Sequence, residues 1–114
     1  MRGYSWIVVP LIVAFAAVFV AAAVEPASAA DLTDAAALTL VRTHCGACHS
    51  RNPTHPVFDP APKGIVLDTI ADLRRYAAQI FEQAVEDRTM PLGNETEMTD
   101  EERDALGRWV KMLK

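Results

Sequence analysis

The sequence predicts an all-α domain over residues 31–114, and three observations support this fold class. Apolar residues recur at helical spacing in three separate stretches. Beyond residue 30, Val and aromatic residues are sparse, whereas alanine, the best helix former, is common. No segment alternates between polar and apolar residues as a half-buried strand does. We therefore expect three main helices and no sheet.

The first expected helix runs from about Leu32 to Cys45. The second runs from about Thr69 to Glu86, and Thr69 followed by Asp72 resembles a capping pair. Each stretch has an apolar face: Ala36, Ala37, Leu40 and Val41 in the first, and Ile70, Leu73, Ala77, Ile80, Phe81 and Ala84 in the second.

The third expected helix has the clearest start. Thr99 and Glu102 form a capping box, and the acidic residues of this first turn suit the positive end of the helix dipole. Lys111 and Lys114 lie at the opposite, C-terminal end, where positive charge is favourable. The apolar stripe of this helix consists of Leu106, Trp109, Val110 and Leu113.

The connections between these helices are irregular. Residues 51–68 hold Pro53, Pro56, Pro60, Pro62 and Gly64, a composition that excludes a long helix or a central strand. Residues 89–98 hold a proline and a glycine and read as a loop. Two long loops without secondary structure are unusual in a small domain. We expect something other than protein to fill the space between them.

Residues 1–30 do not belong to this domain. Arg2 gives a positive start, residues 7–24 carry no charge, and Ala27-Ser28-Ala29 or Ser28-Ala29-Ala30 fits a signal-peptidase site. The uncharged stretch is long for the apolar core of a signal peptide, about 7–15 residues, and short for most spanning helices, roughly 17–25. We expect a signal peptide or an N-terminal hydrophobic helix that anchors the chain. In both cases the domain is exported, because the positive end stays in the cytoplasm.

The charge of the chain limits which partners it can bind, and the small size of the domain indicates how its fold is stabilised. The chain has 11 Lys and Arg against 15 Asp and Glu, a net charge of −4, and no basic cluster, so nucleic acid is a poor partner. A domain this small often needs a disulfide, a metal or a cofactor for stability.

The only two cysteines, Cys45 and Cys48, precede His49 in the motif C-x-x-C-H. Thiol–disulfide enzymes carry C-x-x-C at a helix N-terminus within a βαβ unit, whereas this motif ends a helix. Structural zinc takes two separated ligand pairs, and no second pair follows, since the last histidine is His55. A disulfide between residues three apart closes too short a loop to stabilise much.

Covalent haem attachment fits this pentapeptide better than the alternatives do. The two thiols add to the two vinyl groups of the porphyrin, and the histidine after the second thiol becomes an axial ligand. The small residues Gly46 and Ala47 allow the backbone to lie against the macrocycle. We therefore predict one covalent haem c per chain, held by Cys45, Cys48 and His49.

Met90 is the predicted sixth ligand of the iron. It lies in a loop before Pro91, without periodic apolar neighbours that would place it in a core. Met98 is the runner-up, although its position before the capping box is typical of a hydrophobic staple, and Met112 lies off the apolar stripe. His44 and His55 are too close to His49 in sequence to reach the opposite face easily, and we expect them at the surface or near the haem propionates.

With these motifs, residues 31–114 resemble a class I c-type cytochrome. The stretches VRTHCGACHSRNPTHPVFDPAPKGIVLD and TMPLGNETEMTDEERDALGRW are similar, more narrowly, to the cytochrome c domain of bacterial membrane-bound urate hydroxylases. The chain departs from those proteins in lacking their large membrane domain. The resemblance implies a small fold of three main helices around one covalent haem, in which the first and last helices pack together. There Ala36, Ala37 and Leu40 would meet Leu106, Trp109 and Val110.

The resemblance also implies how the ligands are supported. A proline carbonyl, from Pro62 or Pro60, would accept a hydrogen bond from the ring of His49. Tyr76 would either donate to the Met90 sulfur or pack on the haem edge. Arg74 and Arg75 are candidates for pairing with propionates, although exposed helix arginines usually do not.

These features predict an electron carrier rather than an enzyme. Iron bound by both His49 and Met90 has no open coordination position, and His/Met ligation raises its reduction potential. We expect a periplasmic protein, soluble or anchored by residues 7–24, that exchanges electrons with a membrane-bound or periplasmic dehydrogenase or oxidase. The open alternatives are a five-coordinate haem sensor or peroxidase-like protein, and an electron-transfer subunit of a membrane oxidoreductase. Five acidic residues lie close together in the sequence: Glu95, Glu97, Asp100, Glu101 and Glu102. This acidic cluster favours a partner with a basic or mostly apolar docking patch.

Overall fold

The computed structural model describes residues 30–113, and within this range all regular structure is helical. The predicted all-α class is therefore confirmed for the described part. None of the helices in this range is long and apolar enough to cross a membrane. The predicted signal peptide or anchor, including residues 7–24, lies outside the described residues.

Helix α1 spans Asp34–Cys45. Thr33 caps it by accepting a hydrogen bond from the backbone N–H of Ala36 (3.1 Å), and the acidic Asp34 lies in the first turn. Ala37 and Val41 are buried, while Leu40 is only partly buried. The helix ends at Cys45, so the sequence correctly places the cysteine motif at a helix C-terminus.

The second expected helix is present but broken into three parts. Helix α2 spans Ile70–Arg75, α3 spans Ala77–Ile80, and a π-helix, η2, spans Phe81–Glu86. The capping box of Thr69 and Asp72 is confirmed. The break is at Tyr76, whose backbone leaves the helical region (φ −104°, ψ 17°). The expectation of one continuous α-helix over residues 69–86 is therefore wrong, because Tyr76 interrupts it and its last six residues form a wider π turn.

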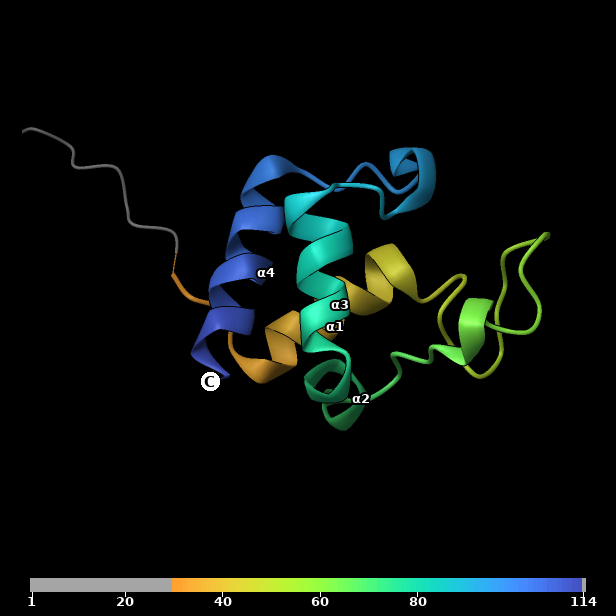
Figure 1. Ribbon diagram of the computed structural model, residues 1–114, viewed down its shortest axis with the longest axis horizontal. Coiled ribbons are helices and arrows are strands. Elements are labelled where there is room, and N and C mark those ends of the chain that lie inside the picture. The colour runs from red at the N-terminus through yellow and green to blue at the C-terminus, as the bar shows by residue number, and fades with distance from the viewer. Residues whose placement is uncertain (1–29, 114) are drawn as a thin grey trace, which may run out of the picture.

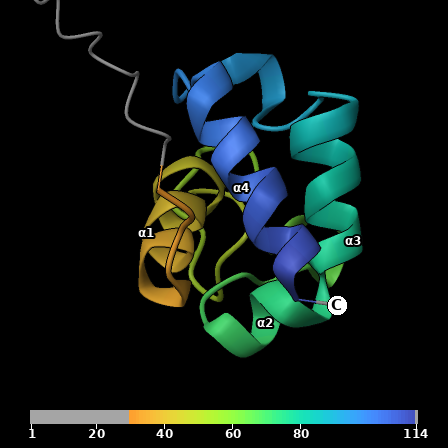
Figure 2. The same cartoon turned by 90° about the vertical axis from the view of Figure 1, so that its left-hand side faces the viewer.

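Helix α4 spans Asp100–Met112 and begins with the expected capping box of Thr99 and Glu102. It lies beside α3 and η2 and also contacts α1 (Figures 1 and 2). Gly107 allows the close approach of η2, because a Cβ there would lie 3.1 Å from Val85 Cγ1. Met112 is exposed, as its position off the stripe predicts.

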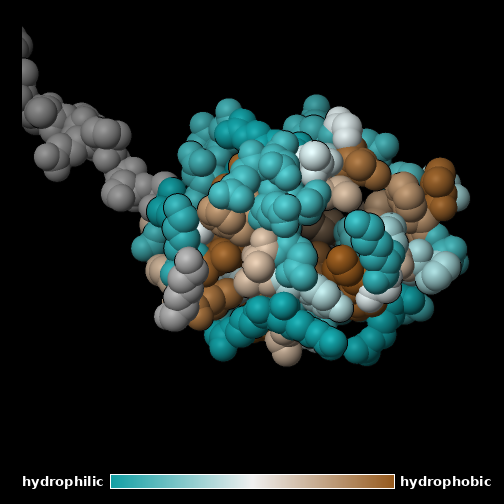
Figure 3. Space-filling model, viewed as in Figure 1, coloured by the Kyte–Doolittle hydropathy of each residue, from teal (hydrophilic) through white to brown (hydrophobic). Residues whose placement is uncertain are grey.

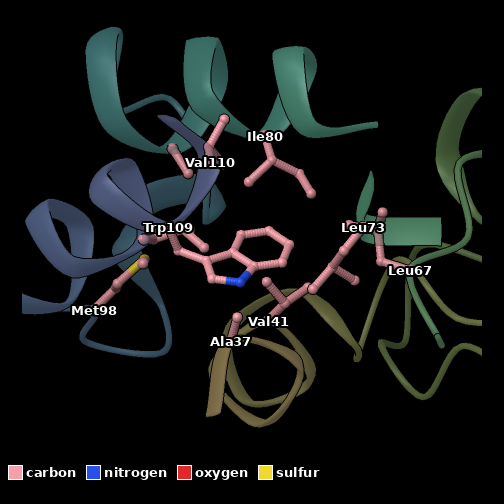
Figure 4. Close-up of a cluster of buried hydrophobic side chains, with 10 residues drawn as sticks. Ala37, Val41, Leu67, Leu73, Ile80, Met98, Trp109 and Val110 are labelled. Carbon is pink, nitrogen blue, oxygen red and sulfur yellow. The ribbon is translucent and has the colours of Figure 1, made fainter. Parts of the chain in front are cut away.

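Trp109 occupies the centre of the core, between α4 and α1 (Figure 4). Its side chain is 1% exposed and its indole Nε1–H donates to Asp34 Oδ1 at 3.1 Å. Ala37 and Val41 lie on the α1 side of the indole, and Ile80 lies on the α3 side. The first and last helices therefore pack together as predicted, but on the α1 side the buried residues are Ala37 and Val41, not the predicted set of Ala36, Ala37 and Leu40.

The two proline-containing connections carry only short 3-10 turns. Pro62–Gly64 (η1) interrupts residues 51–68, which extend away from the helices in Figure 1, and Leu92–Asn94 (η3) interrupts residues 89–98. The second connection returns over the end of η2 to the start of α4. These loops, with the end of α1, surround the candidate site.

Candidate functional site

Two adjoining cavities separate the helices from the loops. The smaller has a volume of about 110 Å³ and the larger about 190 Å³. Cys45, His49, Pro62 and Met90 line both cavities, and Cys48 lines the smaller one. All four predicted site residues therefore meet at one place, although Met90 comes from a distant segment. On the face shown in Figure 3, apolar side chains are visible in a hollow framed by hydrophilic ones.

The cysteine motif forms a tight turn at the end of α1. The backbone N–H groups of Cys48 and His49 both donate to the Cys45 carbonyl, at 3.2 and 2.8 Å. This turn brings both thiols and the imidazole to the same side of the chain end. Gly46 is needed here, since a Cβ would lie 2.5 Å from the carbonyl oxygen of Arg42. The backbone itself thus requires a glycine at position 46, whereas the close approach of Gly46 and Ala47 to a macrocycle stays a prediction.

The ring of His49 has a fixed hydrogen-bond partner. Its Nδ1 lies 3.0 Å from the carbonyl oxygen of Ile65, and the His49 carbonyl accepts from the N–H of Leu67 at 2.8 Å. The expected acceptor, Pro62 or Pro60, is therefore wrong: the chain turns at Pro62–Gly64 and presents the next carbonyl instead. A carbonyl only accepts, so Nδ1 carries the proton, and Nε2 of the neutral ring keeps its lone pair for a metal.

Met90 is held by its backbone at both ends. Its N–H donates to the Gln83 carbonyl at 3.0 Å, and its carbonyl accepts from Arg103 Nη1 at 2.8 Å. Its side chain is half-buried and lines both cavities. Met98, the runner-up, is 4% exposed and belongs to the core cluster, as a staple residue would. Among the methionines of residues 30–113, Met90 is therefore the one that lines these cavities together with His49.

The two other histidines line only the smaller cavity. His44 is buried and so does not lie at the surface, since its Nδ1 bonds to Thr96 Oγ1 at 2.7 Å; the other expected position, near the haem propionates, stays a prediction. Its Nε2 lies 3.2 Å from Glu102 Oε2. His55 is half-buried, with Nε2 3.2 Å from Glu95 Oε2.

Tyr76 lines one of the cavities, whereas Arg74 and Arg75 of α2 line neither. Tyr76 lines the larger cavity together with Met90, but its hydroxyl makes no hydrogen bond within the part of the chain that the structure describes. Arg74 donates to Asp34 Oδ2 at 2.6 Å and so links α2 to α1. The guanidinium of Arg75 lies 5.6 Å from the centre of the Tyr76 ring.

The electrostatics of the thiols oppose redox catalysis. Burial raises the pKa of Cys45 to about 11, and burial together with nearby Glu95 raises the pKa of Cys48. Thiol–disulfide enzymes need the opposite shift, because the thiolate is the nucleophile. Residues 30–113 contain no group of three His, Cys, Asp or Glu side chains placed to hold a metal ion.

Sequence reasoning missed Arg103, which is 4% exposed and contacts the Met90 loop. Its spacing from Leu106 and Val110 puts it on the buried face of α4, and this spacing could have identified it as buried from the sequence.

Comparisons of the chain with protein-family models, curated proteins and solved structures found no match. The functional interpretation therefore depends on the motif and on this geometry.

Proposed function

We propose that this chain is an exported monohaem c-type cytochrome that carries single electrons between redox proteins. The observation that carries the proposal is that Cys45, Cys48, His49 and Met90 line one cavity, although 41 positions separate the two iron ligands in the sequence. The class I fold and the resemblance to the urate hydroxylase cytochrome domain belong to the same proposal. The chain is then a carrier rather than an enzyme.

The donor set fits haem c. Cys45 and Cys48 are free thiols one turn apart, and His49 offers Nε2 while Ile65 holds the other ring nitrogen. Apolar side chains line both cavities around these groups: Phe58, Leu92, Ile65, Leu67, Ile80 and Ala84. Each thiol would add across one vinyl group, with the sulfur bonding to one carbon and the hydrogen passing to the other. This addition needs no oxidant or reductant.

The side chains determine what such a group would do. Bound haem iron supplies a one-electron couple, and His/Met ligation raises its potential. His49 would be fixed in tautomer and orientation by Ile65, and Met90 would fill the remaining position and exclude water. An iron with both positions filled by the protein favours electron transfer over substrate chemistry.

The acidic surface supports a redox partner with a basic patch. In the structure several of the acidic residues already have partners: Asp100 pairs with Arg88 at 2.8 Å, Glu95 with His55, and Glu102 caps α4. Glu97 and Glu101 are exposed. Charge steering of this kind acts mainly on the association rate, so electron transfer to the partner should slow as ionic strength rises. An unchanged rate would contradict the steering.

Export is part of the proposal and has a direct test. N-terminal sequencing of the exported protein should give a chain that begins at Ala30 or Asp31 if the signal peptide is removed. A membrane-bound chain that begins at Met1 would instead show that residues 7–24 anchor it. Co-purification with a membrane dehydrogenase or oxidase would further identify it as a subunit.

The deciding experiment is expression with a haem c maturation system, followed by haem staining of a denaturing gel and visible spectra. We expect stain on the protein band and the weak far-red band of methionine-bound ferric iron. Met90→Ala should abolish that band, while Met112→Ala, a change at an exposed methionine, should keep it. Covalent haem with a high-spin spectrum in the unmutated protein would favour the five-coordinate alternative. A protein band without stain would refute the proposal.

A further inference from the structure

Arg103 is a buried cation without a carboxylate partner. Its side chain lies on α4 and is 4% exposed, yet none of the ion pairs found among residues 30–113 includes it. A guanidinium has only donors, and burying its charge is costly unless those donors are satisfied. Its location therefore depends on the acceptors that surround it.

Arg103 donates hydrogen bonds to three acceptors, and all three belong to η2 or to the loop that follows it. Arg103 Nη1 donates to the carbonyl of Ala84 at 2.5 Å and to the carbonyl of Met90 at 2.8 Å. Nη2 donates to Asn94 Oδ1 at 3.2 Å. The Asn94 side chain in turn bonds to both backbone groups of Met98, at 3.0 and 3.2 Å. One guanidinium thus connects the end of η2, Met90 and the far end of the loop.

The bond to Met90 acts close to the predicted ligand atom. The Met90 N–H is already bound to Gln83, so the bond from Arg103 fixes the other end of the same residue. A backbone held at both its N–H and its carbonyl leaves only side-chain rotations free.

We propose that Arg103 is a positioning residue: its guanidinium holds the 89–98 loop closed and so keeps Met90 beside His49. The ligand part of this inference rests on the proposed function, whereas the closure of the loop does not. Breaking the clamp should increase the fraction of molecules in which Met90 is away from the iron. An added ligand that competes with Met90 will then bind more tightly.

The test compares Arg103→Met, Arg103→Lys and Asn94→Gly with Arg108→Gln. Asn94 has φ 49°, so glycine keeps the backbone while the linking amide is lost. Arg108 is a matched control, because it is an arginine on the same helix that pairs with Asp31 instead of the loop. Two readouts are made on the haem-loaded proteins: imidazole binding to ferric iron, and hydrogen exchange of residues 89–98 by mass spectrometry.

We expect Arg103→Met to raise imidazole affinity by about ten-fold or more, as the loss of a hydrogen bond to a charged group implies, and to speed exchange in the loop. Asn94→Gly should have a smaller effect of the same sign, Arg103→Lys should partly restore closure, and Arg108→Gln should match the unmutated protein. If Arg103→Met does not fold, Asn94→Gly and Arg103→Lys decide.

Unchanged affinity and exchange in a folded Arg103→Met, or in both Arg103→Lys and Asn94→Gly where Arg103→Met does not fold, would overturn the inference, and so would equal changes in Arg108→Gln. The two proposals can fail separately. A chain that binds no haem refutes the proposed function and the ligand role, while loop exchange in that chain still decides whether Arg103 holds the loop.

Discussion

The hydrogen bond between Trp109 and Asp34 joins the last helix to the helix that carries Cys45, and its strength can be measured. Trp109→Phe removes the second ring of a side chain that is 1% exposed, and also the indole N–H that donates to Asp34. Losing about 50 Å² of buried apolar area costs roughly 1.3 kcal/mol, and the hydrogen bond contributes about 1 kcal/mol. The expected loss of unfolding free energy is about 2–3 kcal/mol.

The assay is thermal unfolding of the haem-loaded protein followed by circular dichroism. In a domain of this size 1 kcal/mol corresponds to about 4–8 °C, so Trp109→Phe should lower Tm by about 10–20 °C. Asp34→Ala also breaks the pair with Arg74, and a double-mutant cycle removes that separate contribution. Asp34→Ala should therefore cost about 1 kcal/mol less in the Trp109→Phe background. If it costs the same in both backgrounds, the hydrogen bond does not couple α1 to α4.

Two further predictions concern α4. The backbone N–H of Thr99 lowers the pKa of Glu102 below its usual value, so the capping contribution is complete above the unfolded pKa and is lost as pH falls through the folded one. His44 also faces this carboxylate. Glu102→Gln should therefore lower Tm at pH 7 by a few degrees, as expected for about 0.5–1 kcal/mol. The difference in Tm between the two proteins should vanish in acid, and a difference independent of pH would contradict this account. Gly107→Ala places a Cβ 3.1 Å from Val85, and overpacking of about 1–3 kcal/mol should exceed the gain in helix propensity of up to about 1 kcal/mol. Equal or higher Tm for Gly107→Ala would show that η2 yields freely.

Local interactions account for the parts of the fold that the sequence predicts well. Both capping boxes join residues three apart, and the start of each helix follows from them without any tertiary contact. The break at Tyr76 and the π turn that follows depend on distant contacts. The close fit of Gly107 to the η2 residues Phe81 and Val85 is an example, and periodicity within residues 69–86 contains no sign of it.

In the candidate site, too, some residues could be predicted from the local sequence, whereas one contact depends on the path of the folded chain. Cys45, Cys48 and His49 lie together because the chain makes a single turn there, and Met90 was found because no apolar pattern placed it in a core. The acceptor for His49 could not be read from side chains, since every residue has a backbone carbonyl and only the turn at Pro62–Gly64 selects Ile65.

Each of the two loops is attached to the helices in part through a residue that would hold the haem. Residues 51–68 are joined to the cysteine motif by the bonds of Thr54 and His55 to Ala47 and by the two bonds between His49 and residues 65–67. Residues 89–98 are joined through Met90 and its partners, through the bond between Thr96 and His44, and through the buried Met98. The two loops already meet where His55 contacts Glu95, and a group bound at once to His49 and Met90 would add a further connection across the cavity. Because a domain of this size buries little surface of its own, that connection would stabilise the fold and complete the site together.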